Sequence, residues 1–158
     1  MIFEDIIEIM AQSRKTLAWM GLDLGTKTIG VAVSDRLLSS ATPLRTVRRT
    51  KFSADAQALL DVITNRDIGA IIIGLPRNMD GSEGPRCQST RAFARNISVL
   101  TDLPIGYWDE RLSTVAAERA LLEADTSRKR RAEVIDHVAA GYILQGALDR
   151  ARHIRTVG

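Results

Sequence analysis

The chain has 158 residues, the length of a single domain with room for a hydrophobic core. Its apolar fraction of 45% and charged fraction of 26% are ordinary for a soluble globular protein, and no apolar run approaches the roughly 20 residues that cross a bilayer. The net charge of +3 is mild, and the single cysteine, Cys87, excludes an internal disulfide and fits a cytoplasmic protein.

Apolar and acidic residues interleave over the first fifteen positions, at the spacing of a short amphipathic helix. Acidic residues here, with no basic region before them, are unlike a secretory signal. We therefore expect residues 1–15 to form a helical extension, packed on the domain or on a partner. Residues 16–158 are expected to form one domain.

Three apolar segments joined by short turns follow, at residues 17–24, 28–34 and 41–50, and predict three antiparallel strands. Helices and apolar runs then alternate, which predicts strands parallel to the first. These elements are a helix from residue 53, a strand at 70–74, a helix at 87–100, a strand at 104–109, and helices at 113–124 and 131–152. The pattern indicates an α/β fold, with a mixed five-stranded sheet and helices on both faces.

Three acidic residues stand among apolar or small neighbours. Asp23 falls near the carboxyl end of the first strand, and Glu110 follows the last strand. Ligands bind outside the carboxyl ends of the strands in open α/β sheets. Asp136 shares a helical face with small and apolar residues, so its helix can bring a carboxylate to the same place. Three converging carboxylates need a cation, and oxygen ligands suit Mg²⁺ or Mn²⁺.

Each acid also has a structural alternative. Asp23 could prepare the glycine turn that follows it. Glu110 could pair with Arg111, and Asp136 could favour the dipole of a first helical turn. Asp109 and Glu110 point to opposite faces of the strand, so only one of them can bind metal directly. We favour Glu110 and expect Asp109 to support it or to exchange roles with it.

Basic residues are clustered along the chain, and such clusters can neutralise phosphates. One cluster spans residues 45–51, and another spans residues 128–131. A solvated surface is the alternative for either of them. Including the loop at residues 75–86, the candidates for nucleic-acid contact are Lys27, Arg77, Arg86, Arg111, Arg128, Lys129, Arg130 and Arg131.

Four motifs occur in order along the chain. They are GLDLGTKTIGVA at residues 21–32, GLP at 74–76 with NMDGS at 78–82, DERLST at 109–114, and the helix that carries Asp136. Together they resemble the YqgF/RuvX family of Holliday junction resolvase-like proteins, from about residue 17 to residue 150. The resemblance implies an RNase H-like fold, a cytoplasmic location and metal-dependent nuclease activity, with the family's acids at Asp23, Glu110 and Asp136. It also implies a role in processing the 5′ end of precursor small-subunit (16S) ribosomal RNA.

We predict a nuclease acting on structured nucleic acid, with two Mg²⁺ or Mn²⁺ ions bridged by Asp23 and completed by Glu110 and Asp136. Two functions would use the same site. One is ribosomal RNA processing, with ribosomal precursor particles as partners, and the other is Holliday junction resolution. Junction cleavage would require a symmetric homodimer. The turn at residues 23–26 also resembles the first phosphate turn of actin-like ATPases, so a non-catalytic nucleotide- or nucleic-acid-binding module is an alternative of another class. No convincing second phosphate loop accompanies that turn.

Overall fold

The computed structural model describes the backbone of residues 1–12, 17–112 and 128–157; within the last range, the side chains of residues 128–136 and 155–157 lie outside the description. The described strands form one sheet in the order β1-β6-β5-β2-β3-β4. They are β1 (Ile2–Phe3), β2 (Ala18–Leu24), β3 (Thr28–Ser34), β4 (Ala41–Arg48), β5 (Ile68–Leu75) and β6 (Ile105–Asp109). The described helices are α1 (Ile6–Gln12), α2 (Phe52–Asn65), α3 (Pro85–Ser98), the 3-10 turn η1 (Glu110–Leu112) and α5 (Arg128–Val157). The helix expected at 113–124 lies outside the described residues.

The strand directions confirm the predicted mixed sheet. β2 pairs antiparallel with β3, and β3 with β4, because short connections join them. β5 lies parallel to β2, and β6 lies parallel to β5. The predicted count of five strands was wrong, because β1 pairs in parallel with β6 and adds a sixth. A strand of two residues is too short to show a periodic pattern in the sequence.

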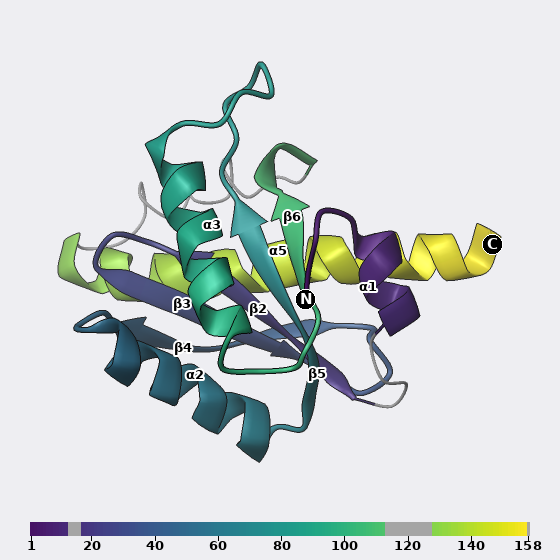
Figure 1. Ribbon diagram of the computed structural model, residues 1–158, viewed down its shortest axis with the longest axis horizontal. Helices are drawn as coiled ribbons and strands as arrows, with labels where there is room; N and C mark the ends of the chain where they lie inside the picture. Colours follow the sequence, from purple (N-terminus) through teal and green to yellow (C-terminus); the bar gives the residue numbers. More distant parts are fainter. Residues whose placement is uncertain (13–16, 113–127, 158) are drawn as a thin grey trace.

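Helices cover both faces of the sheet, as expected (Figure 1). Leu22 of β2 and Ile73 of β5 belong to the core that α2 and α3 cover. Residues at the alternate positions of the same strands, such as Trp19 of β2 and Ile72 of β5, belong to a second core that α1 and α5 cover. Because successive strand side chains point to opposite faces, each strand contributes to both cores. We call these two sides the α3 face and the α5 face.

Helix α5 crosses the sheet at close range, behind the strands in Figure 1. A Cβ atom on Gly21 of β2 would lie 2.7 Å from Leu144 Cβ, and one on Gly74 of β5 would lie 2.5 Å from Ile143 Cδ1. The missing side chains let the helix approach the strand backbones. Among the described residues, no helix is both long and apolar enough to cross a membrane.

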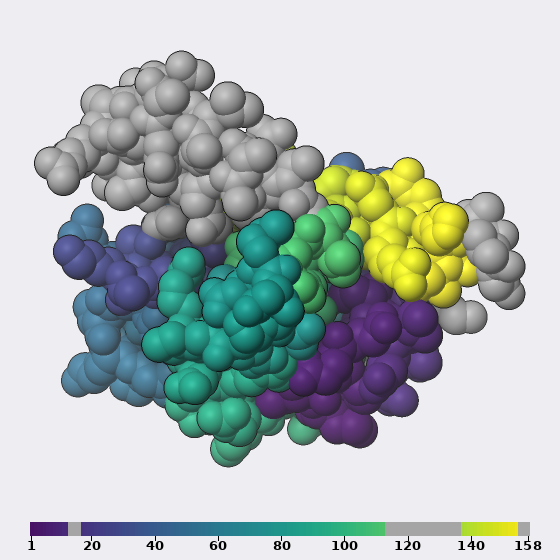
Figure 2. Space-filling view, turned by 90° about the horizontal axis from the view of Figure 1, so that it is seen from above, coloured from purple at the N-terminus to yellow at the C-terminus, as the bar shows by residue number. Residues whose placement is uncertain are grey.

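The N-terminal segment is integrated into this fold. β1 lies at the edge of the sheet beside β6, and α1 follows on the α5 face, where Ile6 and Ile9 are buried. A Cβ atom on Gly106 would lie 2.5 Å from Ile9 Cγ1, so Ile9 occupies the space above this glycine. Figures 1 and 2 show the purple N-terminal segment beside the yellow end of α5, and α1 contacts α5. The segment therefore covers the edge of the sheet at β6.

Candidate active site

Asp23 is a buried carboxylate at the carboxyl end of β2. Its exposed fraction is 4%. Its neighbours Leu22 and Leu24 point into the core under the α3 face, so strand alternation puts Asp23 on the α5 face with Gly21. A carboxylate this deeply buried is expensive unless hydrogen bonds or a cation compensate for its desolvation.

Glu110 lies above Gly74, a residue of β5, which is the strand between β2 and β6. It is the first residue of η1, directly after β6. A Cβ atom on Gly74 would lie 3.4 Å from Glu110 Cδ, so the glutamate extends over the backbone of β5. Leu22 pairs with Ile73, and therefore Asp23 and Gly74 are the next residues on two adjacent strands. Since adjacent strands are about 4.8 Å apart, Asp23 and Glu110 are brought to one region of the α5 face.

Asp136 lies in the backbone of α5, but its side chain lies outside the described residues. The described residues that follow it on the helix, Ala139, Ala140 and Ile143, are buried in the core under the α5 face. They are three, four and seven positions after Asp136, which is the spacing of one helical face. Arg128, Lys129, Arg130 and Arg131 also begin α5, and their side chains lie outside the description as well.

Asp109 lies on the opposite face from Glu110 and is engaged by two arginines. Arg111 donates hydrogen bonds from Nη2 to Asp109 Oδ2 at 2.7 Å and from its backbone N–H to Oδ1 at 3.0 Å. Arg77 Nη1 lies 3.7 Å from Asp109 Oδ2. The hydrogen bond from the Arg111 side chain is the main reason that the pKa of Asp109 lies below its ordinary value. Asp109 therefore stays ionised at neutral pH and forms ion pairs with both arginines.

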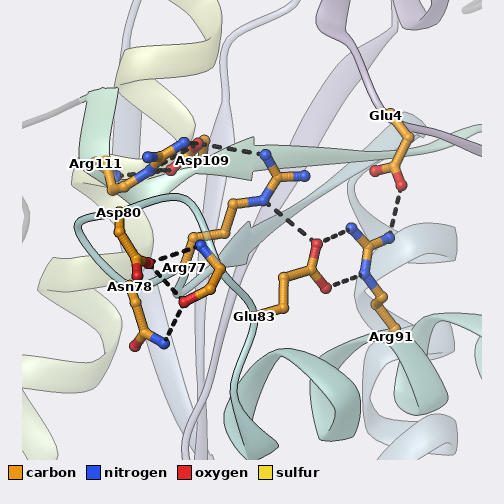
Figure 3. A network of polar contacts seen from close by, with 9 residues as sticks. Glu4, Arg77, Asn78, Asp80, Glu83, Arg91, Asp109 and Arg111 are labelled. Carbon is orange, nitrogen blue, oxygen red and sulfur yellow. Dashed lines mark hydrogen bonds and ion pairs between the residues drawn. The ribbon is translucent and has the colours of Figure 1, made fainter.

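The ion pairs continue from Arg77 to the N-terminal segment (Figure 3). Arg77 Nε lies 3.5 Å from Glu83 Oε2, and Arg91 Nε lies 2.7 Å from Glu83 Oε1. Arg91 also contacts Glu4 at 2.7 Å and lies over the ring of Tyr107. This network joins the end of β6, the loop after β5, helix α3 and the segment before α1.

Arg77 and Arg111, both expected to contact nucleic acid, are thus held by carboxylates. Arg111 also donates a long bond of 3.4 Å to the Met79 carbonyl oxygen and lies against Gly81, whose φ is +89°. Both arginines thus connect the end of β6 to the loop between β5 and α3. Their contact with nucleic acid stays a prediction.

Two other basic candidates, Lys27 and Arg86, lie at the turn between β2 and β3. Lys27 is exposed in the turn, and Arg86 Nη2 lies 3.4 Å from the Leu24 carbonyl oxygen. Arg49, which was noted only as part of the 45–51 cluster, donates a 2.6 Å bond from Nη1 to the Gly25 carbonyl oxygen. Its guanidinium also lies 5.6 Å from the centroid of the Phe93 ring. No pattern in the sequence could have shown that Arg49 reaches this turn, because the contact depends on how β4 packs beside β3.

The donor set on the α5 face fits a hard divalent cation. Asp23 and Glu110 supply carboxylate oxygens, which Mg²⁺ and Mn²⁺ prefer to nitrogen or sulfur ligands. Within the described side chains, no cluster of three or more His, Cys, Asp or Glu residues is present, and Asp136 is not among those side chains. Two of the three expected ligands, Asp23 and Glu110, therefore lie on the α5 face. For the third, Asp136, the structure gives the backbone position in α5.

Comparison with known proteins identifies close relatives. Residues 17–150 match the RuvX family, described as Holliday junction resolvase. The chain is 73% identical over 154 residues to a protein of Ruegeria sp. (strain TM1040) named "Putative pre-16S rRNA nuclease", covering 98% of this chain and 96% of the relative. A Ruegeria pomeroyi protein of the same name is 68% identical over 154 residues, covering 98% of this chain and 100% of the relative.

The fold also resembles that of a solved resolvase. RuvC of T. thermophilus, in complex with a Holliday junction substrate, superposes with a TM-score of 0.52, covering 85% of this chain and 96% of that chain. The sequence identity is 12%, so the likeness concerns the fold. It agrees with the RNase H-like architecture expected from the motifs.

Proposed function

The chain belongs to the RuvX family, and from this membership we propose that it is a nuclease that processes the 5′ end of precursor 16S ribosomal RNA. The observation that carries the proposal is the placement of Asp23 and Glu110 on one face, at the carboxyl ends of β2 and β6, the two parallel strands on either side of β5 and its Gly74. High identity over nearly the whole chain to relatives named for this activity supports the choice of substrate. The substrate is nucleic acid, and precursor ribosomal particles in the cytoplasm are its proposed source.

Asp23, Glu110 and Asp136 would hold one or two divalent ions, Mg²⁺ or Mn²⁺. Bound there, such ions supply Lewis acidity that activates a water molecule and stabilises the departing 3′ oxygen. The protein's own contribution is positional. Burial at the end of β2 fixes the Asp23 carboxylate, and the lack of a side chain at Gly74 leaves room for the Glu110 carboxylate. The proposed assignment of Glu110 over Asp109 is supported by the ion pairs that hold Asp109 on the other face.

Substitution of Asp23 tests this function. Asp23→Asn keeps the shape of the side chain and removes its charge, so Mg²⁺-dependent cleavage of a precursor 16S RNA fragment should fall by at least about 100-fold, the scale of a lost electrostatic contact at a reacting centre. Circular dichroism and RNA binding should be unchanged. Asp102→Asn is the matched control, because Asp102 is exposed at the opposite end of the sheet, before β6. Cleavage by Asp23→Asn at the wild-type rate would refute the site.

Resolution of Holliday junctions is the second candidate, favoured by the family description and by the fold shared with RuvC. Cutting two strands symmetrically requires two active sites, and hence a homodimer. Cleavage of a four-way DNA junction and of the RNA fragment should be compared under identical conditions, with sedimentation used to measure the mass. Faster junction cleavage by a dimer would replace the RNA assignment, whereas preference for RNA would support it.

A further inference from the structure

The arginines near the candidate site fall into two groups. Arg77, Arg91 and Arg111 all form ion pairs with carboxylates. Arg49 and Arg86 are bound to backbone carbonyl oxygens instead, at Gly25 and Leu24. No carboxylate in the described part of the chain lies within ion-pair distance of either. Their positive charge is therefore not neutralised by those carboxylates.

Of these two arginines, Arg49 is held more firmly. Arg49 donates one short bond of 2.6 Å and stacks over the Phe93 ring, so its guanidinium is fixed on two sides. Arg86 extends from the first turn of α3 toward the same turn of the chain. A guanidinium carries five N–H donors, and one bond to a carbonyl leaves donors for a second acceptor.

The carbonyls that the arginines contact belong to the two residues directly after Asp23. The guanidinium groups thus lie at the edge of the candidate site, with Lys27 exposed in the same turn. Phosphates follow one another every 3.4 Å along the axis of a nucleic-acid strand, so a strand cleaved at Asp23 must place neighbouring phosphates at this edge. Guanidinium groups that no described carboxylate neutralises are well suited to bind a phosphate with two parallel hydrogen bonds.

We propose that Arg49 and Arg86 form a phosphate clamp, with Lys27 beside it, that binds the nucleic-acid backbone next to the scissile phosphate. The role of the clamp rests on the proposed nuclease function, but the clamp can be tested separately by measuring RNA binding without cleavage. Arg77 and Arg111 do not belong to it, because Asp109 and Glu83 already hold them. The clamp positions the substrate and takes no part in bond cleavage.

The test measures how salt weakens binding of a fluorescein-labelled RNA duplex with a single-stranded tail. EDTA is present, so that binding is read without cleavage. Each lost phosphate contact should reduce the slope of log affinity against log salt by about 1. In the double variant Arg49→Gln/Arg86→Gln, the magnitude of this slope, measured between roughly 50 and 200 mM salt, should therefore be smaller by about 2. Arg36→Gln is the control, because Arg36 pairs with Asp67 just beyond the other end of β3 and should leave the slope unchanged.

Further variants separate charge from fold. Arg49→Lys/Arg86→Lys retains both charges and should keep most of the slope, although affinity falls because the two-bond geometry is lost. If the double glutamine variant does not fold, the single Arg86→Gln change of an exposed residue should lower the slope by about 1. An unchanged slope in the folded glutamine variants, an equal loss in Arg36→Gln, or no RNA binding by the wild type would overturn the clamp.

Cleavage of the same RNA in Mg²⁺ is measured in parallel. If the salt slopes of the wild type and the double glutamine variant differ by the expected amount but the wild type does not cleave, the nuclease proposal fails and the clamp stands. If the wild type cleaves and the glutamine variants bind with the wild-type slope, the clamp fails and the nuclease proposal stands.

Discussion

Gly74 is the residue whose missing side chain joins the two described acids. A methyl group there would lie 2.5 Å from Ile143 Cδ1, so Ile143 would have to shift, and it would come into van der Waals contact with Glu110 Cδ at 3.4 Å. Gly74→Ala should destabilise the fold by about 1–3 kcal/mol through overpacking. The added methyl group and the moved Ile143 side chain take up space beside Glu110, so cleavage should also fall by about 100-fold if the carboxylate moves by about 1 Å. Denaturant unfolding and single-turnover cleavage would measure the two effects.

Gly84→Ala provides the comparison for this change. A Cβ atom on Gly84 would contact only Asn78 Nδ2, at 3.8 Å, so the added methyl group fits without displacement. Cleavage by this variant should remain close to that of the wild type. Equal loss of activity in both alanine variants would show that Gly74 does not position Glu110.

Asp109 is expected to make stability depend on pH. Its pKa is lowered by the Arg111 hydrogen bonds, so its contribution to folding is complete above its ordinary value of 3.8 and is lost as pH falls through the lower folded-state value. Asp109→Asn should therefore unfold at a lower temperature than the wild type near neutral pH. The difference should shrink below about pH 3.8. Thermal melts across the acid range would measure it, and a difference that stays constant with pH would contradict the ion pair.

Single residues also show what the sequence could and could not predict about the site. The alternation of a strand was enough to separate Asp109 from Glu110, and the structure places them on opposite faces. Strand order was not predictable, so nothing indicated that β5 would lie between the two acids with a glycine at the crossing. The ion pair of Arg77 with Asp109 joins residues 32 positions apart, so no local pattern in the sequence indicated it.

At the scale of elements, the N-terminal segment contributes buried side chains to the core. Ile9 of α1 is fully buried against Gly106 of β6. Ile9→Ala leaves a cavity there and should lower the free energy of unfolding by about 2–5 kcal/mol. Ile7→Ala on the same helix should change it by no more than about 0.5 kcal/mol, because Ile7 is 48% exposed. Urea unfolding of both variants would measure this, and equal small effects would show that α1 is not an integral part of the fold.

The elements were predicted best where apolar periodicity was strong. The strand at residues 28–34 coincides with β3, and the neighbouring strands differ from prediction by one or two residues at their ends. β1 escaped prediction because its two residues gain their strand conformation only by pairing with β6. The segment was expected to be helical, and α1 accounts for only part of it.

For the whole molecule, a bound metal ion should stabilise the folded state, because the acids converge only after folding. At a Mn²⁺ concentration 100 times Kd, the gain is about 2.7 kcal/mol. For a domain of this size this corresponds to a rise in Tm of roughly 5–10 °C. Asp23→Asn should lose most of the rise, and Asp102→Asn should keep it. A rise of equal size in Asp23→Asn would place the metal elsewhere.

Helix α5 also gives the enzyme an order of assembly during synthesis. It is 30 residues long and follows all six strands in the chain, yet it supplies the cover of one face of the sheet and carries Asp136. At about 5–20 residues per second, the ribosome completes it roughly 2–9 seconds after β6 and the turn η1 have been made. A nascent chain therefore holds Asp23 and Glu110 before it can close the face around them. A nuclease proposed to cut ribosomal RNA precursors would thus lack Asp136, the third of its proposed acids, until α5 has been made.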